Sequence, residues 1–359
     1  MKLLSEFKSG NFTLKNHIVM APMTRSRAIG NVPNALMASY YSQRSGVGLM
    51  ITEGVSPSPN GLGYARIPGI FSDEQVRGWK LVTDAVHEKG SKIFVQLMHT
   101  GRISHELNLP RAGRILAPSA VKPEGKTWTD SSGLMDFPVP NEMSPEEIIS
   151  TREEFVQAAI NAMEAGFDGV ELHSANGYLL EQFLSPVSNI RTDEYGGSIE
   201  NRCRFVLEVA AAVSLAIGKE KTGIRLSPYG VASDMPLYPE IEQEYTYLVE
   251  QLDQTGLLYV HLVDHSSMGA PEVPDSIKQT FRSKFAGLLI LCGGYDRERA
   301  EKDLINGKAD LIAFGRPFLS NPDLVDRFTH NRPLSESLDS NTLYSPGEKG
   351  YTDYPVFQE

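Results

Sequence analysis

Eight short and nearly uninterrupted apolar runs recur along this chain of 359 residues. They lack the alternation of strands that have one face in water, and instead match parallel strands that are covered on both sides. Helical patterns lie between them, and strands alternating with helices over this length predict an α/β fold, a (β/α)8 TIM barrel. The predicted strands are residues 18–23, 49–55, 92–99, 169–175, 222–228, 257–264, 288–294 and 309–316.

Two helix starts carry capping signals. Ser72 is followed three residues later by Gln75, and Ser144 by Glu147, with proline at the first position of the second helix. A doubly wound sheet is the alternative to the barrel, but its G-x-G-x-x-G fingerprint follows none of the predicted strands. Further helices are predicted over residues 198–217, 240–255 and, shorter, 297–306.

Two segments depart from a minimal barrel, and we expect both to belong to one domain that spans residues 1–359. Residues 100–143 are a long excursion rich in Pro and Gly, which predicts a partly ordered cap over the barrel mouth. Residues 331–359 form a tail whose aromatic content favours docking over disorder. Its tyrosines are Tyr344, Tyr351 and Tyr354.

Charge and composition argue against several classes of function. With 34 Lys and Arg against 45 Asp and Glu, the net charge is −11, which argues against broad binding to nucleic acid or to an anionic membrane. No segment approaches the ~20 apolar residues of a membrane span, and no signal-peptide pattern begins the chain, so we expect a cytoplasmic protein. The two cysteines, Cys203 and Cys292, complete no metal pattern with the histidines and cannot hold an iron–sulfur cluster on four thiolates.

The active sites of such barrels lie at the carboxyl ends of the strands, where polar residues and glycines gather in this chain. The loops after the last two predicted strands carry Gly293, Gly294, Gly315 and Arg316, whose backbone N–H groups and guanidinium can bind one phosphate. The other candidate residues at these ends are Pro22, Met23, Thr24, Gly54, Gln96, Met98, His173, Asn176, Tyr178 and Arg225.

The stretch from His173 through Asn176 to Tyr178 places an imidazole, a carboxamide and a phenol at the end of one strand. Such donors can polarise a carbonyl or nitro oxygen and deliver a proton beside it. Taken singly, each also has a structural interpretation as an interior histidine or a polar loop residue. Arg225 lies inside an apolar strand and needs a buried partner, for which a salt bridge to Glu171 and a bound anion are equal alternatives.

These residues fall within motifs that resemble those of the Old Yellow Enzyme family, in order and over nearly the whole chain. With threonine at position 24, the chain resembles the classical branch, near the bacterial N-ethylmaleimide and nitrate-ester reductases. The thermophilic-like branch usually has cysteine at this position. The motifs are Ala21-Pro-Met-Thr-Arg-Ser-Arg27, Thr52-Glu-Gly54, Phe94-Val-Gln-Leu97, His173-x-x-Asn176-Gly-Tyr178, Arg191-Thr-Asp-Glu-Tyr-Gly-Gly-Ser198 with Asn201-Arg202, Phe314-Gly-Arg-Pro317 and Gly350-Tyr-Thr-Asp-Tyr-Pro355.

The resemblance implies noncovalent FMN in the barrel mouth, reduced by NADPH or NADH. Arg225 would lie beside the N1/O2 edge of the isoalloxazine, Gln96 at its pyrimidine edge and Thr24 at its O4. The phosphate site described above would then hold the ribityl phosphate. The residues implied to pack against the ring are Pro22, Met23 and Gly54.

It also implies a ping-pong cycle, in which an electron-poor alkene or nitro compound binds after the nicotinamide has left. His173 and Asn176 would hydrogen-bond its carbonyl or nitro oxygen, and Tyr178 would protonate the α-carbon as general acid. Met98 takes the place of a bulky aromatic found in several relatives, which predicts a roomier pocket. The implied substrate-pocket residues are Tyr64, Met98 and Tyr344.

Two other functions are consistent with parts of this pattern. A flavin-free barrel lyase or aldolase would use the same phosphate site, although Lys92 lies at the wrong end of its strand for a covalent role. A binding protein would hold FMN without turnover. The pattern leaves open the substrate among enones, maleimides, nitroalkenes and nitrate esters, the choice between NADPH and NADH, and a monomeric or homodimeric state.

Overall fold

Eight parallel strands close into a barrel in the computed structural model, which describes residues 1–358. Each strand neighbours the next barrel strand along the chain, and β14 closes the ring on β3. The predicted TIM barrel and its eight strands are confirmed. The strands are β3 Ile18–Met20, β4 Leu49–Val55, β5 Lys92–Leu97, β10 Gly169–Ser174, β11 Thr222–Leu226, β12 Tyr259–Val263, β13 Leu288–Cys292 and β14 Leu311–Phe314.

Most of these strands end before their predicted limits, because the chain leaves the ladder where the candidate site begins; β3, for example, ends at Met20. The register between β4 and β5 shifts between Ile51 and Gly54, a bulge of the kind that re-aims side chains beside active sites. The short strands outside the barrel are β1 Phe7–Ser9, β2 Phe12–Leu14, β6 Leu116–Ala117, β7 Lys126–Thr129, β8 Gly133–Asp136 and β9 Asn141–Glu142.

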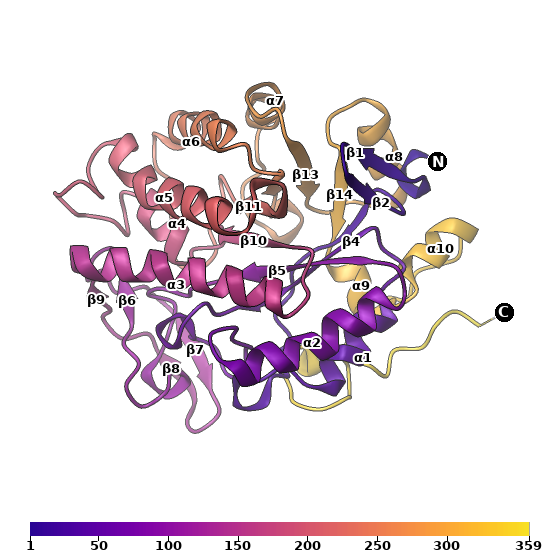
Figure 1. The fold of residues 1–359 in the computed structure, drawn as a ribbon, viewed down its shortest axis with the longest axis horizontal. Coiled ribbons are helices and arrows are strands. Elements are labelled where there is room, and N and C mark those ends of the chain that lie inside the picture. Colours follow the sequence, from indigo (N-terminus) through magenta and orange to yellow (C-terminus); the bar gives the residue numbers. More distant parts are fainter. Residues whose placement is uncertain (359) are drawn as a thin grey trace.

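Helices alternate with the strands and form the outer ring of the barrel (Figure 1). Ser72 and Ser144 cap α2 and α3 through reciprocal capping boxes with Gln75 and Glu147, as their sequences predict. The helices are α1 Ala35–Gln43, α2 Asp73–His87, α3 Pro145–Glu164, α4 Leu179–Leu184, α5 Ile199–Ile217, α6 Ile241–Thr255, α7 Asp275–Lys284, α8 Arg297–Ile305, α9 Arg316–Ser320 and α10 Leu324–His330.

The sequence patterns do not predict α1, α4, α7, α9 and α10. Helix α7 buries only Ile277 and Phe281, one turn apart, so its apolar face is too short to stand out in the sequence. Helix α4 is the opposite case, because all of its residues are buried and no polar face marks it. Within residues 1–358, none of the helices combines the length and the apolar character needed to cross a membrane.

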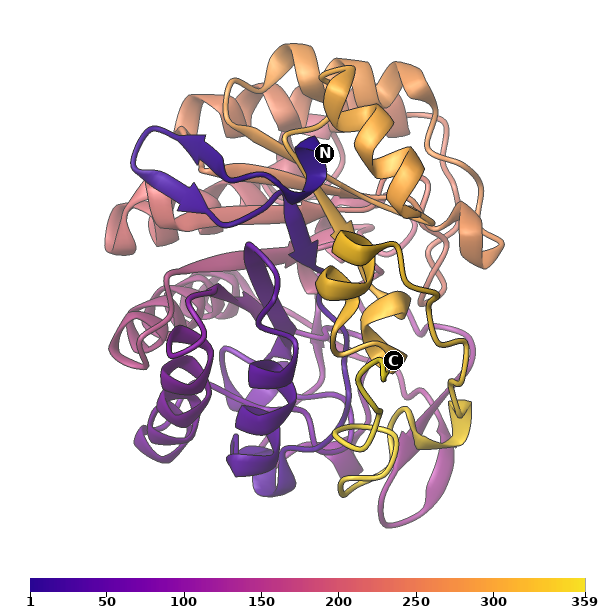
Figure 2. The ribbon, with the colours of Figure 1, turned by 90° about the vertical axis from the view of Figure 1, so that its right-hand side faces the viewer.

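The lower half of the barrel interior is an apolar plug. Phe94 and Tyr259 fill much of it, and glycines on neighbouring strands make room for these rings. A Cβ on Gly169 would lie 2.4 Å from Phe94, and one on Gly223 would lie 2.3 Å from Tyr259. The β1–β2 hairpin packs against this plug, at the end of the barrel opposite the β7–β8 hairpin (Figures 1 and 2). A second, larger apolar core lies between the strands and the helices.

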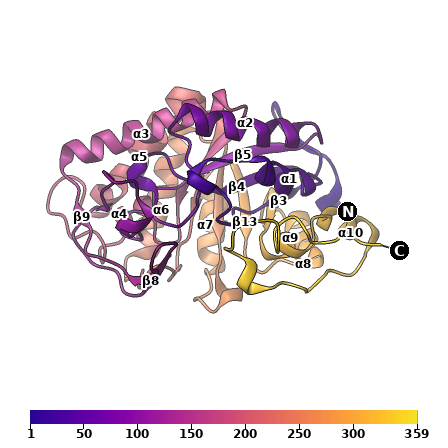
Figure 3. The ribbon, with the colours of Figure 1, turned by 90° about the horizontal axis from the view of Figure 1, so that it is seen from below.

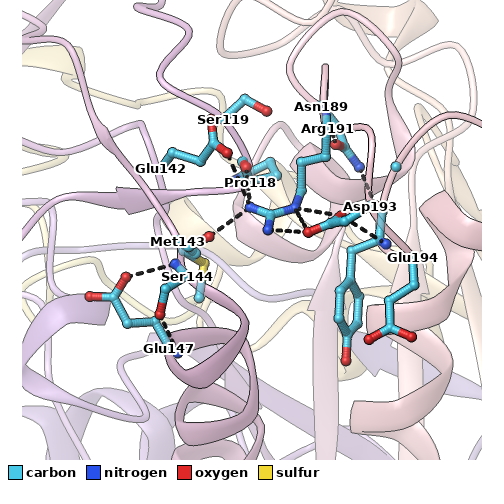
Figure 4. A network of polar contacts seen from close by, with 12 residues as sticks. Pro118, Ser119, Glu142, Met143, Ser144, Glu147, Asn189, Arg191, Asp193 and Glu194 are labelled. Atoms are coloured by element: carbon cyan, nitrogen blue, oxygen red, sulfur yellow. Dashed lines mark hydrogen bonds and ion pairs between the residues drawn. The ribbon is translucent and has the colours of Figure 1, made fainter.

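Residues 100–143 and the C-terminal segment both border the mouth, which is seen from below in Figure 3. Arg191 ties the first of these, the cap, to the chain between α4 and α5. Its guanidinium donates to the carbonyl oxygens of Pro118 at 2.8 Å and Met143 at 2.7 Å, and pairs with Asp193 at 2.5 Å (Figure 4). One buried side chain therefore fixes both ends of the strand-bearing part of the cap.

The C-terminal segment, yellow in Figure 2, packs on α1 and on the loop after β3. Tyr351 is fully buried and stacks on Tyr40, with ring centroids 4.1 Å apart. The buried guanidiniums of Arg25 and Arg27 donate to main-chain carbonyl oxygens of residues 342–350. The segment is thus joined to the start of the barrel by an aromatic stack and by charge-assisted hydrogen bonds.

Replacing Tyr351 by alanine should lower the free energy of unfolding by roughly 3–5 kcal/mol, because a fully buried ring leaves a cavity. Tyr351→Phe is the matched control. The Tyr351 hydroxyl has no hydrogen-bond partner among residues 1–358, so its loss should change the free energy by less than about 1 kcal/mol. Urea unfolding followed by circular dichroism measures both variants. An alanine variant as stable as the parent protein would contradict this anchoring role.

Candidate active site

Above the apolar plug, the interior of the barrel becomes polar. Glu171 on β10 accepts a hydrogen bond from the Gln96 amide at 2.8 Å, and its other oxygen lies 2.8 Å from Nδ1 of His261. All three side chains are buried. Gln96 uses one of its two amide hydrogens in this contact, so the other is available for the flavin edge that the resemblance assigns to it.

Arg225 lies level with His173 in the register of β11 against β10. The alternative of a salt bridge to Glu171 is wrong, since among residues 1–358 no carboxylate oxygen lies within 4.0 Å of the Arg225 guanidinium. In the same part of the chain its one polar contact is the sulfur of Cys292 at 4.0 Å, and its Nε has no partner. A buried cation with unused donors requires an anionic or strongly accepting ligand.

His173 and Tyr178 meet edge to face, with ring centroids 4.9 Å apart. The hydroxyl oxygens of Tyr178 and Tyr64 lie 3.2 Å apart, a hydrogen bond in which either hydroxyl can donate. Burial and the nearby guanidinium of Arg225 lower the pKa of His173 well below its usual range, so the imidazole is neutral. Burial raises the pKa of Tyr178, so the phenol keeps its proton at neutral pH. The pair therefore offers an uncharged donor and a proton source.

The backbone turns sharply between these two rings. Asn176 has a φ of 60° and Gly177 one of 79°, both in the left-handed region. Glu181 holds this turn, because its carboxylate accepts from the Gly177 N–H at 2.5 Å and from the Ser227 hydroxyl at 2.6 Å. Ser227 in turn accepts from the Asn176 N–H at 2.8 Å, and Tyr245 donates to Glu181 at 3.0 Å. One buried carboxyl group thus fixes the backbone of the candidate oxygen-binding residue.

The glycines of the predicted phosphate site leave no room for side chains. A Cβ on Gly293 would lie 2.3 Å from the main-chain oxygen of Asp264, in the loop after β12, and one on Gly294 would lie 2.8 Å from Ser267 in the same loop. Arg316 is exposed and donates to the Ser267 hydroxyl at 3.0 Å. The paired strands β13 and β14 bring the two predicted loops to the same edge of the mouth. These loops contain Gly293, Gly294, Gly315 and Arg316.

The loop after β3 carries three further predicted residues, Pro22, Met23 and Thr24, all half-buried. It adjoins the phosphate loops, since a Cβ on Gly315 would lie 3.7 Å from the sulfur of Met23. Three glycine-bearing or proline-bearing loops therefore gather at one side of the mouth. His173 and Arg225 lie at the strand ends across it.

Met98 and Gly54 are packed together at the ends of β5 and β4. A Cβ on Gly54 would lie 2.4 Å from the sulfur of Met98, so a side chain there would displace the methionine. Met98 itself is 1% exposed and packs against Leu62 and Ile67. The methionine side chain thus fills space behind the strand end, and the roomier pocket inferred from it stays a prediction.

Tyr64 packs against this same cluster, whereas Tyr344 is 59% exposed on the C-terminal segment. The sequence interpretation gave no role to Glu181, Ser227 or His265. Glu181 could have been noticed in the sequence, because it is a glutamate within the apolar run of α4. The other two lie near the carboxyl ends of β11 and β12, where barrel sites are built.

Comparison with known proteins agrees with this architecture. The NADH:flavin oxidoreductase / NADH oxidase family matches residues 2–335. The protein named 12-oxophytodienoate reductase 1 of Oryza sativa subsp. japonica is 43% identical over 363 residues, which cover 99% of this chain and 93% of the rice protein. The Old Yellow Enzyme homologue from Zymomonas mobilis superposes with a TM-score of 0.93 at 38% identity, covering 99% of this chain and 100% of that one.

The chain belongs to the Old Yellow Enzyme family. The resemblance found in the sequence motifs is therefore confirmed, and the protein is an oxidoreductase of a flavin-dependent family. Morphinone reductase is another solved relative, with a TM-score of 0.94, 43% identity and coverage of 99% of this chain and 96% of that one. A structure of morphinone reductase in complex with tetrahydroNAD has a TM-score of 0.94.

Two features of this Old Yellow Enzyme fit the FMN that its family implies. The turn at Gly293 and Gly294 exposes main chain where side chains cannot fit, beside the guanidinium of Arg316, which is a donor set suited to a phosphate. Arg225 adds a buried cation whose Nε has no partner among the described residues, suited to the accepting edge of a flavin ring.

Glu181 should make the stability of the protein depend on pH. Burial raises the pKa of Glu181 from 4.5 to about 7 in the folded state. Because the folded state holds the proton more tightly, the contribution of this carboxyl to stability is fully present below pH 4.5 and is lost as the pH rises through about 7.

The variant E181Q removes this titration and keeps the shape of the side chain. The free energy of unfolding of the parent, minus that of E181Q, should therefore decrease between about pH 4.5 and about pH 7. Urea unfolding at a series of pH values measures the difference, in which other titrating groups cancel. A difference that does not change with pH would refute the assignment.

Proposed function

We propose that this Old Yellow Enzyme is an FMN-dependent NAD(P)H oxidoreductase that reduces activated carbon–carbon double bonds. Its substrates would be α,β-unsaturated carbonyl compounds, maleimides or nitroalkenes, with nitrate esters as a further class. The observation that carries the proposal is the combination of a neutral buried imidazole at His173, a carboxamide on a fixed backbone at Asn176 and a protonated phenol at Tyr178. His173 lies level with Arg225, whose guanidinium is partly unsatisfied among the described residues.

Bound FMN would supply the chemistry of taking up a hydride from NADPH or NADH and passing it to the alkene. In our proposal, Gly293, Gly294, Gly315 and Arg316 bind its phosphate, and Arg225 stabilises negative charge on the ring. The residues proposed to contact the rest of the ring are Pro22, Met23, Thr24, Gly54 and Gln96.

The residues of the mouth would act on the substrate in two ways. His173 and Asn176 would donate hydrogen bonds to its carbonyl or nitro oxygen and stabilise charge that develops there. Tyr178 would deliver its proton to the α-carbon, which the raised pKa favours because the phenol stays protonated before transfer. Tyr64, at 3.2 Å, can then return a proton to Tyr178. The proposed pocket wall comprises Tyr64, Met98 and Tyr344.

The names of the relatives support carbonyl substrates, because 12-oxophytodienoate reductase and morphinone reductase are both named for compounds that carry an oxo group. Cys203 and Cys292 are both free, which is consistent with a reducing compartment, and we infer a cytoplasmic enzyme.

Tyr178→Phe should lower the rate of alkene reduction by roughly 10²–10⁴-fold, because the proton donor is lost. Reduction of the bound flavin by NADPH should change little, since that step needs no proton from the phenol. Anaerobic stopped-flow measurement of the two half-reactions separates the effects. Equal loss in both would rule out Tyr178 as the proton donor.

The function itself is tested by anaerobic titration of the purified protein with NADPH and NADH, followed by a panel of the proposed acceptors. We expect a yellow protein that the nicotinamide bleaches and an alkene recolours. A protein that stays colourless after purification with added FMN would contradict the proposal and favour a flavin-free lyase or aldolase. A yellow protein that neither nicotinamide bleaches would favour an FMN-binding protein without turnover.

A further inference from the structure

His265 lies within hydrogen-bonding distance of a residue proposed to bind the substrate's oxygen. Its Nε2 is 2.7 Å from Oδ1 of Asn176, across 89 residues of sequence. His265 follows β12 and Asn176 follows β10, so the contact spans the carboxyl ends of strands separated by β11. None of the motifs that carry the family resemblance includes His265.

The segment that carries His265 is held in place on both sides. The carboxylate of Asp264 pairs with Lys278 at 3.0 Å and accepts from the Ser266 N–H at 2.9 Å. The Asp264 N–H donates to the carbonyl oxygen of Cys292 at 2.8 Å. Burial alone would raise the pKa of Asp264, but the hydrogen bonds from Ser266 and the ammonium of Lys278 bring it below its usual value. The ion pair and hydrogen bonds of Asp264 therefore fix the backbone from which the His265 imidazole projects.

The chemistry of a carboxamide makes this contact directional. One end of the Asn176 amide accepts hydrogen bonds and the other donates, and only the donating end can bind a carbonyl or nitro oxygen. Oδ1 faces His265, and within residues 1–358 no group accepts from Nδ2. Ser227 already holds the Asn176 backbone, so rotation of the side chain is the remaining freedom.

The imidazole of His265 is uncharged near neutral pH. Burial, followed by the guanidinium of Arg225, lowers the pKa of His265 to about 4, while Asp264 opposes the shift. A neutral imidazole has one N–H, and placing that hydrogen on Nε2 makes it a donor to Oδ1 of Asn176.

We propose that His265 is a positioning residue, which fixes the Asn176 carboxamide with its NH2 group toward the acceptor oxygen of the substrate. The inference rests on the proposed ene-reductase function and adds to it a contact from the loop after β12. His265 acts through Asn176 and needs no contact of its own with the substrate.

Three variants test this role in the FMN-loaded enzyme. H265L removes the donor and keeps most of the volume. H265Q can place an amide nitrogen near the position of Nε2, whereas the shorter H265N cannot reach it. The readouts are kcat/KM for 2-cyclohexenone and the competitive inhibition constant of cyclohexanone, which has the carbonyl oxygen and no reducible double bond. Flavin content and melting temperature serve as folding controls.

We expect H265L and H265N to lower kcat/KM and to raise the inhibition constant by about 5- to 30-fold, the loss of one oriented hydrogen bond. H265Q should recover most of both. In a double-mutant cycle, H265L should add almost nothing to N176A, because its effect passes through Asn176.

Other outcomes would overturn the proposal. Additive effects of H265L and N176A would mean that His265 acts independently of Asn176. Tighter inhibition in H265L would mean that the amide is held in the opposite orientation. If the wild type reduces 2-cyclohexenone and H265L has the same kcat/KM and inhibition constant, the role of His265 is refuted and the proposed function stands. If the wild type reduces no alkene, the proposed function itself is refuted. If H265L does not fold, the contrast between H265Q and H265N decides.

Discussion

Closure of an eight-stranded parallel barrel sends alternate side chains of each strand into one narrow interior, and the rest of this structure depends on how that space is filled. The lower layer is filled by large rings over glycines. In the upper layer, Gln96 and His261 share the carboxylate of Glu171. Arg225 has no such partner, because its level of the barrel offers His173 and the thiol of Cys292 instead of a carboxylate. That imbalance is what supports the proposed binding site at the mouth.

Buried Arg and Glu side chains that bond to main chain hold the loops around the mouth. Arg191 fixes the cap, Arg27 fixes the C-terminal segment and Glu181 fixes the turn at Asn176. A polar or charged group removed from water is unfavourable unless its hydrogen bonds are geometrically good, so each of these groups enforces one arrangement of its loop. The site residues are therefore positioned before any ligand arrives, which is the condition under which hydrogen bonds stabilise a transition state most.

The sequence predicted the barrel strands well because strands covered on both sides have an unambiguous apolar signature, and their few polar residues mark the inward positions near the mouth. It predicted α2 and α3 from their caps. It missed α4 because all of its residues are buried and give no periodicity, and α7 because its apolar face has only two residues. The Arg225–Glu171 alternative failed because spacing along strands does not give register between them. The contact of His265 with Asn176 lay beyond prediction, since it depends on the path of a loop.

The C-terminal segment has a consequence for how the molecule is completed during synthesis. Arg25 and Arg27 lie beside the loop that carries Thr24, yet the carbonyl oxygens they bond are more than 300 residues later in the chain. A growing chain that has already made every barrel strand still holds these guanidiniums without their acceptors. Translation runs from the N-terminus, so this loop emerges long before it can reach its native contacts. The mouth of this barrel is finished only after residues 342–350 have followed every barrel strand out of the ribosome.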